Sequence, residues 1–144
     1  MTYVGEDGQK HRPVMLHRVV YGSIERFIGI LTENFAGAFP IWLAPIQARI
    51  LPITDKHHDY AYALKDKADK LGFRVEVDAR NEKTGFKIRE GQVKKIPYLL
   101  VVGDKECEEN TVAVRRYGQK DTVTMSVDEF IKLMAEKVNT RALN

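Results

Sequence analysis

The chain has 144 residues, of which 44% are hydrophobic and 30% charged, with a net charge of +3 at pH 7. Every apolar run ends well short of the roughly 18 residues of a membrane span, so we expect a soluble globular protein with no membrane partner. The first ten residues lack the apolar core of a signal peptide, and the single cysteine, Cys107, excludes an internal disulfide, so we expect a cytoplasmic protein. The net charge alone does not indicate a nucleic-acid binder.

The first part of the chain predicts one strand and one helix. "PVMLHRVV", residues 13–20, is rich in valine and predicts a strand. The next segment has apolar residues at helical spacing, Ser23 as its N-cap and Gly37 as its stop. "AFPIWLAPIQ" then holds two prolines, which favours a connector. We therefore expect three parts: residues 1–39, a connector at 40–45, and a domain at 46–144.

From Ala48 onwards the pattern alternates between strands and helices in the order βαβαβββα. We expect strands at residues 48–53, 73–79, 96–103, 110–118 and 120–126, and helices at residues 54–72, 83–95 and 126–143. The last helix begins with a capping box, Ser126 with Glu129 three residues later. Five strands and three helices in this order favour an α/β fold, with parallel strands in the middle and an antiparallel hairpin at one edge.

Common catalytic motifs are absent from the sequence: it has no P-loop, no GxGxxG, no HExxH and no CxxC. His57 and His58 are adjacent on an expected helix, where neighbouring side chains point apart. A metal site and a solvated helix face are both open for this pair, and the spacing favours the solvated face. An arginine near the start of the first helix, Arg26, could clamp a phosphate or pair with Glu25, and the residues alone favour the ion pair.

Positive charge gathers in residues 78–98, which carry six basic and three acidic side chains. The basic residues are Arg80, Lys83, Lys87, Arg89, Lys94 and Lys95. A basic helix near the carboxyl ends of parallel strands could bind a phosphate backbone or an RNA loop. Composition by itself favours a solvated helix face instead.

The amino-acid sequences of several segments resemble those of one enzyme family. "LHRVVYGSIERFIGILTENFAGAFPIWLAPIQ" resembles the end of the catalytic domain of bacterial threonyl-tRNA synthetases. "DARNEKTGFKIRE", "IPYLLVVGDKE" and "VAVRRYG" resemble the anticodon-binding domain of the same family. The resemblance covers nearly the whole chain. It implies an anticodon-binding domain with a five-stranded mixed sheet and three helices, preceded by a strand and a helix of a class II synthetase catalytic domain.

The same resemblance implies roles for two residues of the first part. Arg26 matches the arginine of the third class II motif, which binds ATP, and His17 matches one ligand of the zinc ion that selects threonine in this family. The intact enzyme, a threonine–tRNA ligase, would use ATP, magnesium and zinc and form a homodimer. The other zinc ligands and the first two class II motifs are missing from this sequence. We therefore expect this chain to bind none of these cofactors, to be inactive as a ligase by itself, and to be a monomer.

For the anticodon loop of tRNA(Thr), the resemblance implies that Asn81, Glu106 and Arg115 read bases. Threonine anticodons end in a central G followed by U, and an Arg fork or a carboxylate suits the edges of guanine. Lys83, Lys87 and Arg89 are further candidates, as contacts to backbone phosphates. Two alternatives stay open: a stand-alone RNA-binding module derived from such a domain, and a small-molecule enzyme that uses the sheet edge.

Overall fold

The computed structural model describes residues 1–143 and divides the chain into two compact units, one ending at Leu31 and one beginning at Thr32. The first unit contains a small antiparallel hairpin, formed by β1 (Tyr3–Val4) and β2 (Lys10–His11). Helix α1 spans Ile24–Asn34, as its apolar spacing predicts, so it begins in the first unit and ends in the second.

The strand predicted at residues 13–20 is wrong, because this segment has no strand in the structure. A strand is stabilised by hydrogen bonds to a neighbouring strand, and no described segment pairs with residues 13–20. The valines at these positions favour an extended backbone, but extended backbone without a partner does not make a sheet.

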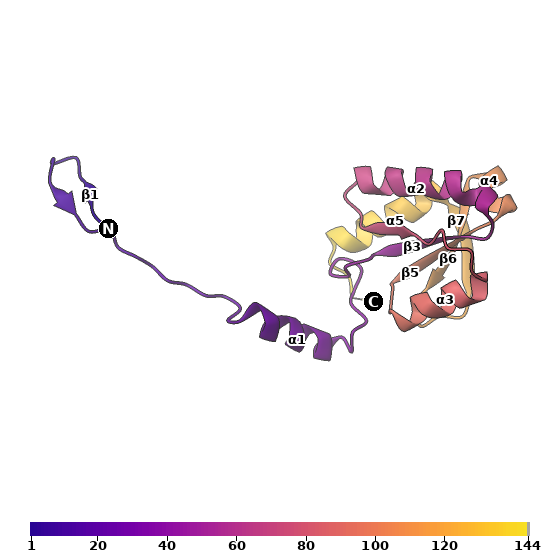
Figure 1. The fold of residues 1–144 in the computed structure, drawn as a ribbon, viewed down its shortest axis with the longest axis horizontal. Coiled ribbons are helices and arrows are strands. Elements are labelled where there is room, and N and C mark those ends of the chain that lie inside the picture. Colours follow the sequence, from indigo (N-terminus) through magenta and orange to yellow (C-terminus); the bar gives the residue numbers. More distant parts are fainter. Residues whose placement is uncertain (144) are drawn as a thin grey trace. The chain divides into compact units, whose positions relative to one another are not determined.

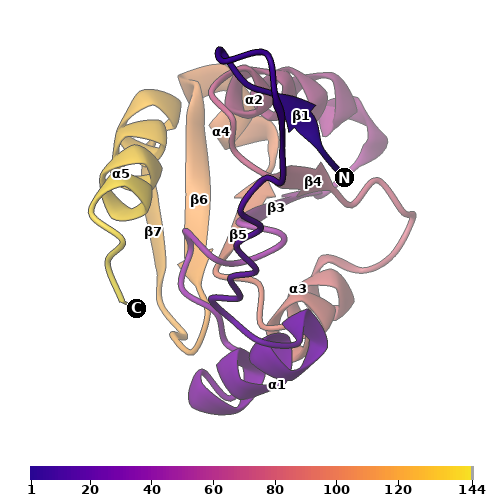
Figure 2. The same ribbon diagram turned by 90° about the vertical axis from the view of Figure 1, so that its left-hand side faces the viewer.

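The second unit is built on a mixed sheet with the strand order β4-β3-β5-β6-β7. β3 (Ala48–Pro52) pairs in parallel with both β4 (Val75–Val77) and β5 (Tyr98–Val102). β6 (Thr111–Arg116) pairs antiparallel with β5 and with β7 (Thr122–Ser126). Figure 2 shows β5, β6 and β7 side by side. The five-stranded mixed sheet and the antiparallel hairpin at one edge confirm the expected fold, although the parallel strands β4, β3 and β5 extend to the other edge instead of lying only in the middle.

Helices cover both faces of this sheet. α2 (His58–Lys70), which follows a short 3-10 turn (Asp55–His57), and α5 (Val127–Asn139) lie on one face, and α3 (Thr84–Val93) lies on the other (Figure 1). The Ser126–Glu129 capping box at the start of α5 is confirmed. One short helix, α4 (Asp104–Glu109), was not predicted, because its six residues are almost all charged and show no apolar period. Within the described residues, no helix is long and apolar enough to cross a membrane.

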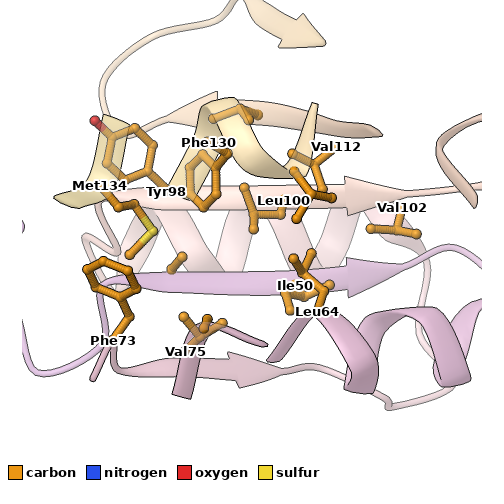
Figure 3. Packing of buried hydrophobic residues seen from close by; sticks show 14 of the residues in the cluster. Ile50, Leu64, Phe73, Val75, Tyr98, Leu100, Val102, Val112, Phe130 and Met134 are labelled. Carbon is orange, nitrogen blue, oxygen red and sulfur yellow. The ribbon is translucent and has the colours of Figure 1, made fainter. Parts of the chain in front are cut away.

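The larger part of the core lies between the sheet and the helices α2 and α5 (Figure 3). Ile50 and Leu100 from the central strands pack with Leu64 of α2 and with Phe130 and Met134 of α5. A smaller cluster of Leu51, Ile96 and Leu99 lies on the other face, under α3. There Gly91 of α3 lies so close to Leu99 that a Cβ atom at residue 91 would be 2.5 Å from a Leu99 methyl group. The close approach of α3 therefore requires glycine at this position.

The segment expected to be a connector is well packed. Ile41 is buried in the larger core, and Arg74 donates from its guanidinium to the carbonyl oxygens of Trp42 (3.2 Å) and Ala44 (2.9 Å). Buried Gln47 donates to the carbonyl oxygen of Ile41 at 2.9 Å and accepts from the Arg74 backbone N–H at 2.8 Å. This part of the chain is therefore held on the second unit by hydrogen bonds as well as by apolar contact.

Candidate functional site

The three parallel strands β4, β3 and β5 end at the same edge of the sheet, where ligands of open α/β sheets commonly bind. The segments that leave these strands carry two of the predicted base-reading residues. Asn81 is exposed in the loop after β4, and Glu106 is half-buried in α4, which follows β5. We call this region, formed by residues 53–55, 78–83 and 103–106, the carboxyl edge.

The loop that carries Asn81 is fixed by a buried carboxylate. Asp78 is only 7% exposed, and it accepts hydrogen bonds from Arg80 at 2.8 Å (Nε) and 2.7 Å (Nη2). These bonds lower the pKa of Asp78 below its usual range. Arg80 also donates to Glu90 of α3 at 2.6 Å, so the loop is joined to the helix beside it. Asn81 therefore projects from a loop whose preceding residues are firmly held.

Lys87 was predicted to contact phosphates, and the structure places it differently. Its side chain is 2% exposed, and its ammonium donates to the carbonyl oxygens of Pro52 (3.3 Å) and Asp78 (3.0 Å). A buried ammonium cannot reach a phosphate on an RNA backbone that stays outside the domain. Lys87 instead joins the end of β3 to the start of the Asn81 loop, and the expected phosphate contact is withdrawn.

Glu106 has a structural role beside its predicted one. It is the third residue of α4, and its carboxylate accepts the backbone N–H of Gly103 at 2.9 Å, which caps the helix. A Cβ atom at Gly103 would lie 2.9 Å from Cδ1 of Ile53 and 3.2 Å from Oε2 of Glu106, so a larger residue there would displace these side-chain ends. The cap uses Oε2, and no described hydrogen bond involves Oε1. One oxygen is thus available to accept hydrogen bonds from a ligand.

The prediction of a solvated face for the two histidines is wrong for His57, which is 3% exposed. Its Nε2 lies 3.0 Å from Oδ1 of Asp104, the first residue of α4. Its Nδ1 lies 3.3 Å from the backbone N of Thr54, which donates to it, so the ring proton belongs on Nε2. This bond to Asp104 lowers the pKa of the Asp104 carboxyl. His57 therefore joins the turn after β3 to the helix that carries Glu106.

Arg115 lies on the face of the sheet rather than at the carboxyl edge. It is paired with Leu99 of β5, so it shares the face that α3 covers in part. Leu99 is three residues from the end of β5 at Val102, a distance of ~10 Å at about 3.3 Å per residue. The Nε atom of Arg115 is buried and has no hydrogen-bond partner among the described residues. The structure thus brings Asn81 and Glu106 to one edge and leaves Arg115 on the adjoining sheet surface.

Several basic side chains in residues 78–98 already have partners within the protein. Glu90 is 2.6 Å from Arg80 and 2.7 Å from Lys94, and these two bonds lower the pKa of Glu90 to about 2, with Lys94 as the larger cause. Lys95 donates to the carbonyl oxygen of Ala36. The exposed Lys83 and Arg89 have no described ion pair, so they are the members of the cluster that keep an accessible charge.

His17 and Arg26, the two residues expected to belong to a catalytic domain, lie in the first unit. The ring of His17 is 3.0 Å from the sulfur of Met15, and Arg26 is exposed. The expected ion pair of Arg26 with Glu25 is not among the described contacts; Glu25 accepts the hydroxyl of Ser23 at 2.7 Å instead. Within residues 1–143, no three His, Cys, Asp or Glu side chains come together as a metal site requires. The residues described here therefore do not fit a zinc ion by themselves.

Comparisons with known proteins show which family the chain is similar to. Residues 47–137 match the family model of the anticodon binding domain. The threonine–tRNA ligase of Desulforamulus reducens is 60% identical over 143 residues, which are 99% of this chain and 22% of that protein. The threonine–tRNA ligase of Symbiobacterium thermophilum is 56% identical over 144 residues, again 22% of its length. This chain thus spans about a fifth of the curated relatives that it matches.

Two solved structures share the fold. The RNA binding domain of threonyl-tRNA synthetase from Cryptosporidium parvum is 31% identical with a TM-score of 0.77, over 91% of this chain and 33% of that one. The prolyl-tRNA synthetase of the same organism is 25% identical with a TM-score of 0.68, over 80% of this chain and 27% of that one. Since the family model covers well over half of the residues and the sheet has the expected order, the chain belongs to the anticodon-binding domain family.

Proposed function

We propose that this chain is the C-terminal, anticodon-recognising part of a threonine–tRNA ligase and that it binds the anticodon loop of tRNA(Thr). The observation that carries the proposal is the placement of Asn81 and Glu106 at the carboxyl edge of a sheet whose family is that of anticodon-binding domains. The relatives that match 99% of the chain bear the threonine–tRNA ligase name, which supports the amino-acid assignment.

The chemistry of the three residues suits an unpaired anticodon. The bases of a single-stranded loop expose their hydrogen-bonding edges, whereas those of duplex RNA do not. The free oxygen of Glu106 can accept from the N–H groups of guanine, and the amide of Asn81 can both donate and accept. The guanidinium of Arg115 can donate to the acceptor pair of guanine or stack on a base as the loop crosses the sheet face. The exposed Lys83 and Arg89 suit phosphates.

The proposal for the intact protein goes further than the described residues. As part of a class II ligase, His17 would be one of several zinc ligands and Arg26 would bind ATP, with magnesium at the phosphates. The apolar residues of the first unit would then be covered by the rest of a catalytic domain, in a cytoplasmic homodimer. A stand-alone RNA-binding module is not favoured, because relatives named threonine–tRNA ligase match almost the whole length of this chain.

Anticodon recognition can be tested with a titration of RNA stem-loops at two salt concentrations. We expect a loop with the threonine anticodon to bind more tightly than a scrambled loop at both concentrations, because base contacts depend less on salt than phosphate contacts do. Arg115→Ala should cost about 1–3 kcal/mol of affinity and reduce the preference. Equal binding of the two loops would refute the proposal.

The matched control for this titration is Arg116→Ala. Arg116 is the next residue of β6 and is paired with Tyr98, so its side chain lies on the opposite face of the sheet. This control removes the same charge from the same strand. If Arg115→Ala and Arg116→Ala weaken binding equally for both loops, Arg115 acts through charge and does not read a base.

A further inference from the structure

A hollow of about 160 Å³ lies at the carboxyl edge, next to Asn81. Its walls come from the turn after β3, which includes Ile53 and Thr54, and from the loop after β4, and Lys87 of α3 also lines it. Pockets for drug-sized ligands enclose roughly 300–1,000 Å³. This hollow is therefore suited to a single ring-sized group that enters from the surface.

Lys87 gives this hollow its distinctive chemistry. A lysine ammonium has three N–H donors and no acceptor, and two of these donors have described partners, the carbonyl oxygens of Pro52 and Asp78. Lys87 is only 2% exposed and lines the hollow, so a group that enters the hollow is placed to reach the third donor. A ligand that places an acceptor there forms a hydrogen bond shielded from bulk water, whereas a ligand that places a donor there leaves both donors unpaired.

We propose that Lys87 donates a hydrogen bond to a carbonyl oxygen of an unstacked base that occupies this hollow. The proposal rests on the proposed function and adds a base-selecting residue to it. Guanine and uracil present a carbonyl oxygen on the edge where adenine and cytosine present an amino group. The amino group of adenine or cytosine is a hydrogen-bond donor, as the Lys87 ammonium is, so neither group would have an acceptor. The hollow therefore selects for G or U and against A or C.

The position of Asn81 supports the same assignment. Its side chain is exposed and lines the same hollow, so a base that reaches Lys87 also comes within range of an amide that donates and accepts. No described ion pair joins Lys87 to Asp78, whose two carboxylate oxygens accept from Arg80, or to Asp55 and Glu82, which also line the hollow. The Lys87 donor therefore stays available for the base.

The test combines a change in the protein with a change of one base in the RNA. Lys87→Met removes the donor and keeps an unbranched side chain that ends at the ε position, one atom short of lysine. In the RNA, 2-aminopurine replaces the central guanine of the threonine anticodon, and a uracil analogue without O4 replaces the last anticodon base in a second RNA. Each analogue lacks the carbonyl oxygen and also the neighbouring ring N–H, so only the part of the loss that depends on Lys87 reports on the oxygen. Dissociation constants of the two proteins for the native and modified stem-loops form two double-mutant cycles.

At the position that Lys87 contacts, we expect a coupling of about 5- to 150-fold between Lys87 and the carbonyl oxygen. Lys87→Met should therefore weaken the native loop by that factor and the modified loop by almost nothing. If the two factors multiply at both positions, Lys87 acts only by holding the loop in place, and the proposal is wrong. The matched control, Lys83→Met at an exposed lysine, should weaken the native and modified loops by the same factor.

Lys87 also joins two segments of the fold, so Lys87→Met could unfold the domain. Lys87→Gln, which keeps one donor group, serves as a second variant, and circular dichroism of each variant establishes that it is folded. The wild-type domain alone gives a further decisive result, because full affinity for both modified loops overturns the proposal. The proposed function would fail in a different way: the wild-type domain would then bind the threonine loop and the scrambled loop equally.

Discussion

The two compact units of the chain differ in how far their apolar residues are buried. In the unit that ends at Leu31, Leu16 is 88% exposed and Ile24 is 67% exposed, whereas in the unit that begins at Thr32, Ile50 and Leu100 are at most 1% exposed. The second unit has a sheet covered on both faces, and the first has only a two-strand hairpin and most of one helix. Sequence composition does not distinguish these cases, because burial requires a second layer of structure.

Helices α1 and α5 show the same difference in burial. Both have apolar residues at helical spacing and both form, which shows how well the pattern predicts a helix. Val127, Phe130 and Met134 of α5 are buried against the sheet, while α1 has no buried residue. The pattern thus predicts the helix and its apolar face, and it does not predict whether that face has a cover within the same chain.

The largest expected effect compares two isoleucines. Ile50→Ala removes a fully buried side chain from the centre of the sheet, so we expect the free energy of unfolding to fall by about 2–5 kcal/mol. Ile30→Ala makes the same change on α1, where the side chain is 54% exposed, and should change it by less than about 0.5 kcal/mol. Urea denaturation followed by circular dichroism measures both, and equal losses would remove the contrast between the two units.

A second pair of changes uses the adjacent histidines. His57→Ala removes a side chain that is 3% exposed, together with its bonds to Asp104 and Thr54, so it should cost about 1–3 kcal/mol. His58 is half-buried and 3.7 Å from Asp55, and His58→Ala should cost less than about 0.5 kcal/mol. Thermal unfolding of the two variants in the same buffer compares them. A larger loss for His58→Ala would contradict the placement of His57.

A third prediction concerns acid stability. The folded-state pKa of Glu90 is lowered to about 2 by Lys94 and Arg80, so its ion pairs stabilise the fold above its ordinary pKa of 4.5, and this stability is lost as the pH falls towards 2. Glu90→Gln should therefore flatten the fall in unfolding free energy between pH 4.5 and 2. Glu82→Gln, at an exposed glutamate without a described ion pair, is the control and should keep the wild-type slope. An unchanged slope in Glu90→Gln would show that the ion pairs contribute nothing.

The smallest expected effect is that of removing residues 1–31. The second unit has its own core, so the shortened chain should keep the unfolding free energy of the full chain within about 0.5 kcal/mol. It should also bind the threonine stem-loop with the same affinity, since the residues proposed to contact RNA all lie after Thr32. Denaturation and titration of the shortened chain check both points, and a tenfold loss of affinity would assign the first unit a part in binding.

The sequence predicted most of the fold because its signals are local. The capping box at Ser126, the turn at Gly118 and the continuous apolar run of β5 each determine an element from a few neighbouring residues. The strand at residues 13–20 failed because a strand depends on a partner elsewhere in the chain. Helix α4 was missed for lack of an apolar period, although Gly103 followed by Glu106 is a helix-start signal that could have indicated it.

The candidate site was predicted less completely, because contacts between distant residues decide it. Lys87 reads as one more surface lysine, and only the approach of Pro52 and Asp78 makes it buried. His57 likewise depends on Asp104, which is 47 residues away in the sequence. The resemblance to a family indicated which residues to consider, but it did not indicate that Arg115 lies on the sheet face and Asn81 at the carboxyl edge.

The central claim is that this domain reads an anticodon loop with its carboxyl edge and the sheet face beside it. An NMR titration of the labelled domain with the threonine anticodon stem-loop tests it most directly. We predict that the amide signals that shift most belong to Asn81, Glu106, Arg115 and their neighbours, and that those of α2 and α5 shift little. Largest shifts on α2 and α5, or the same shifts with a scrambled loop, would contradict the account.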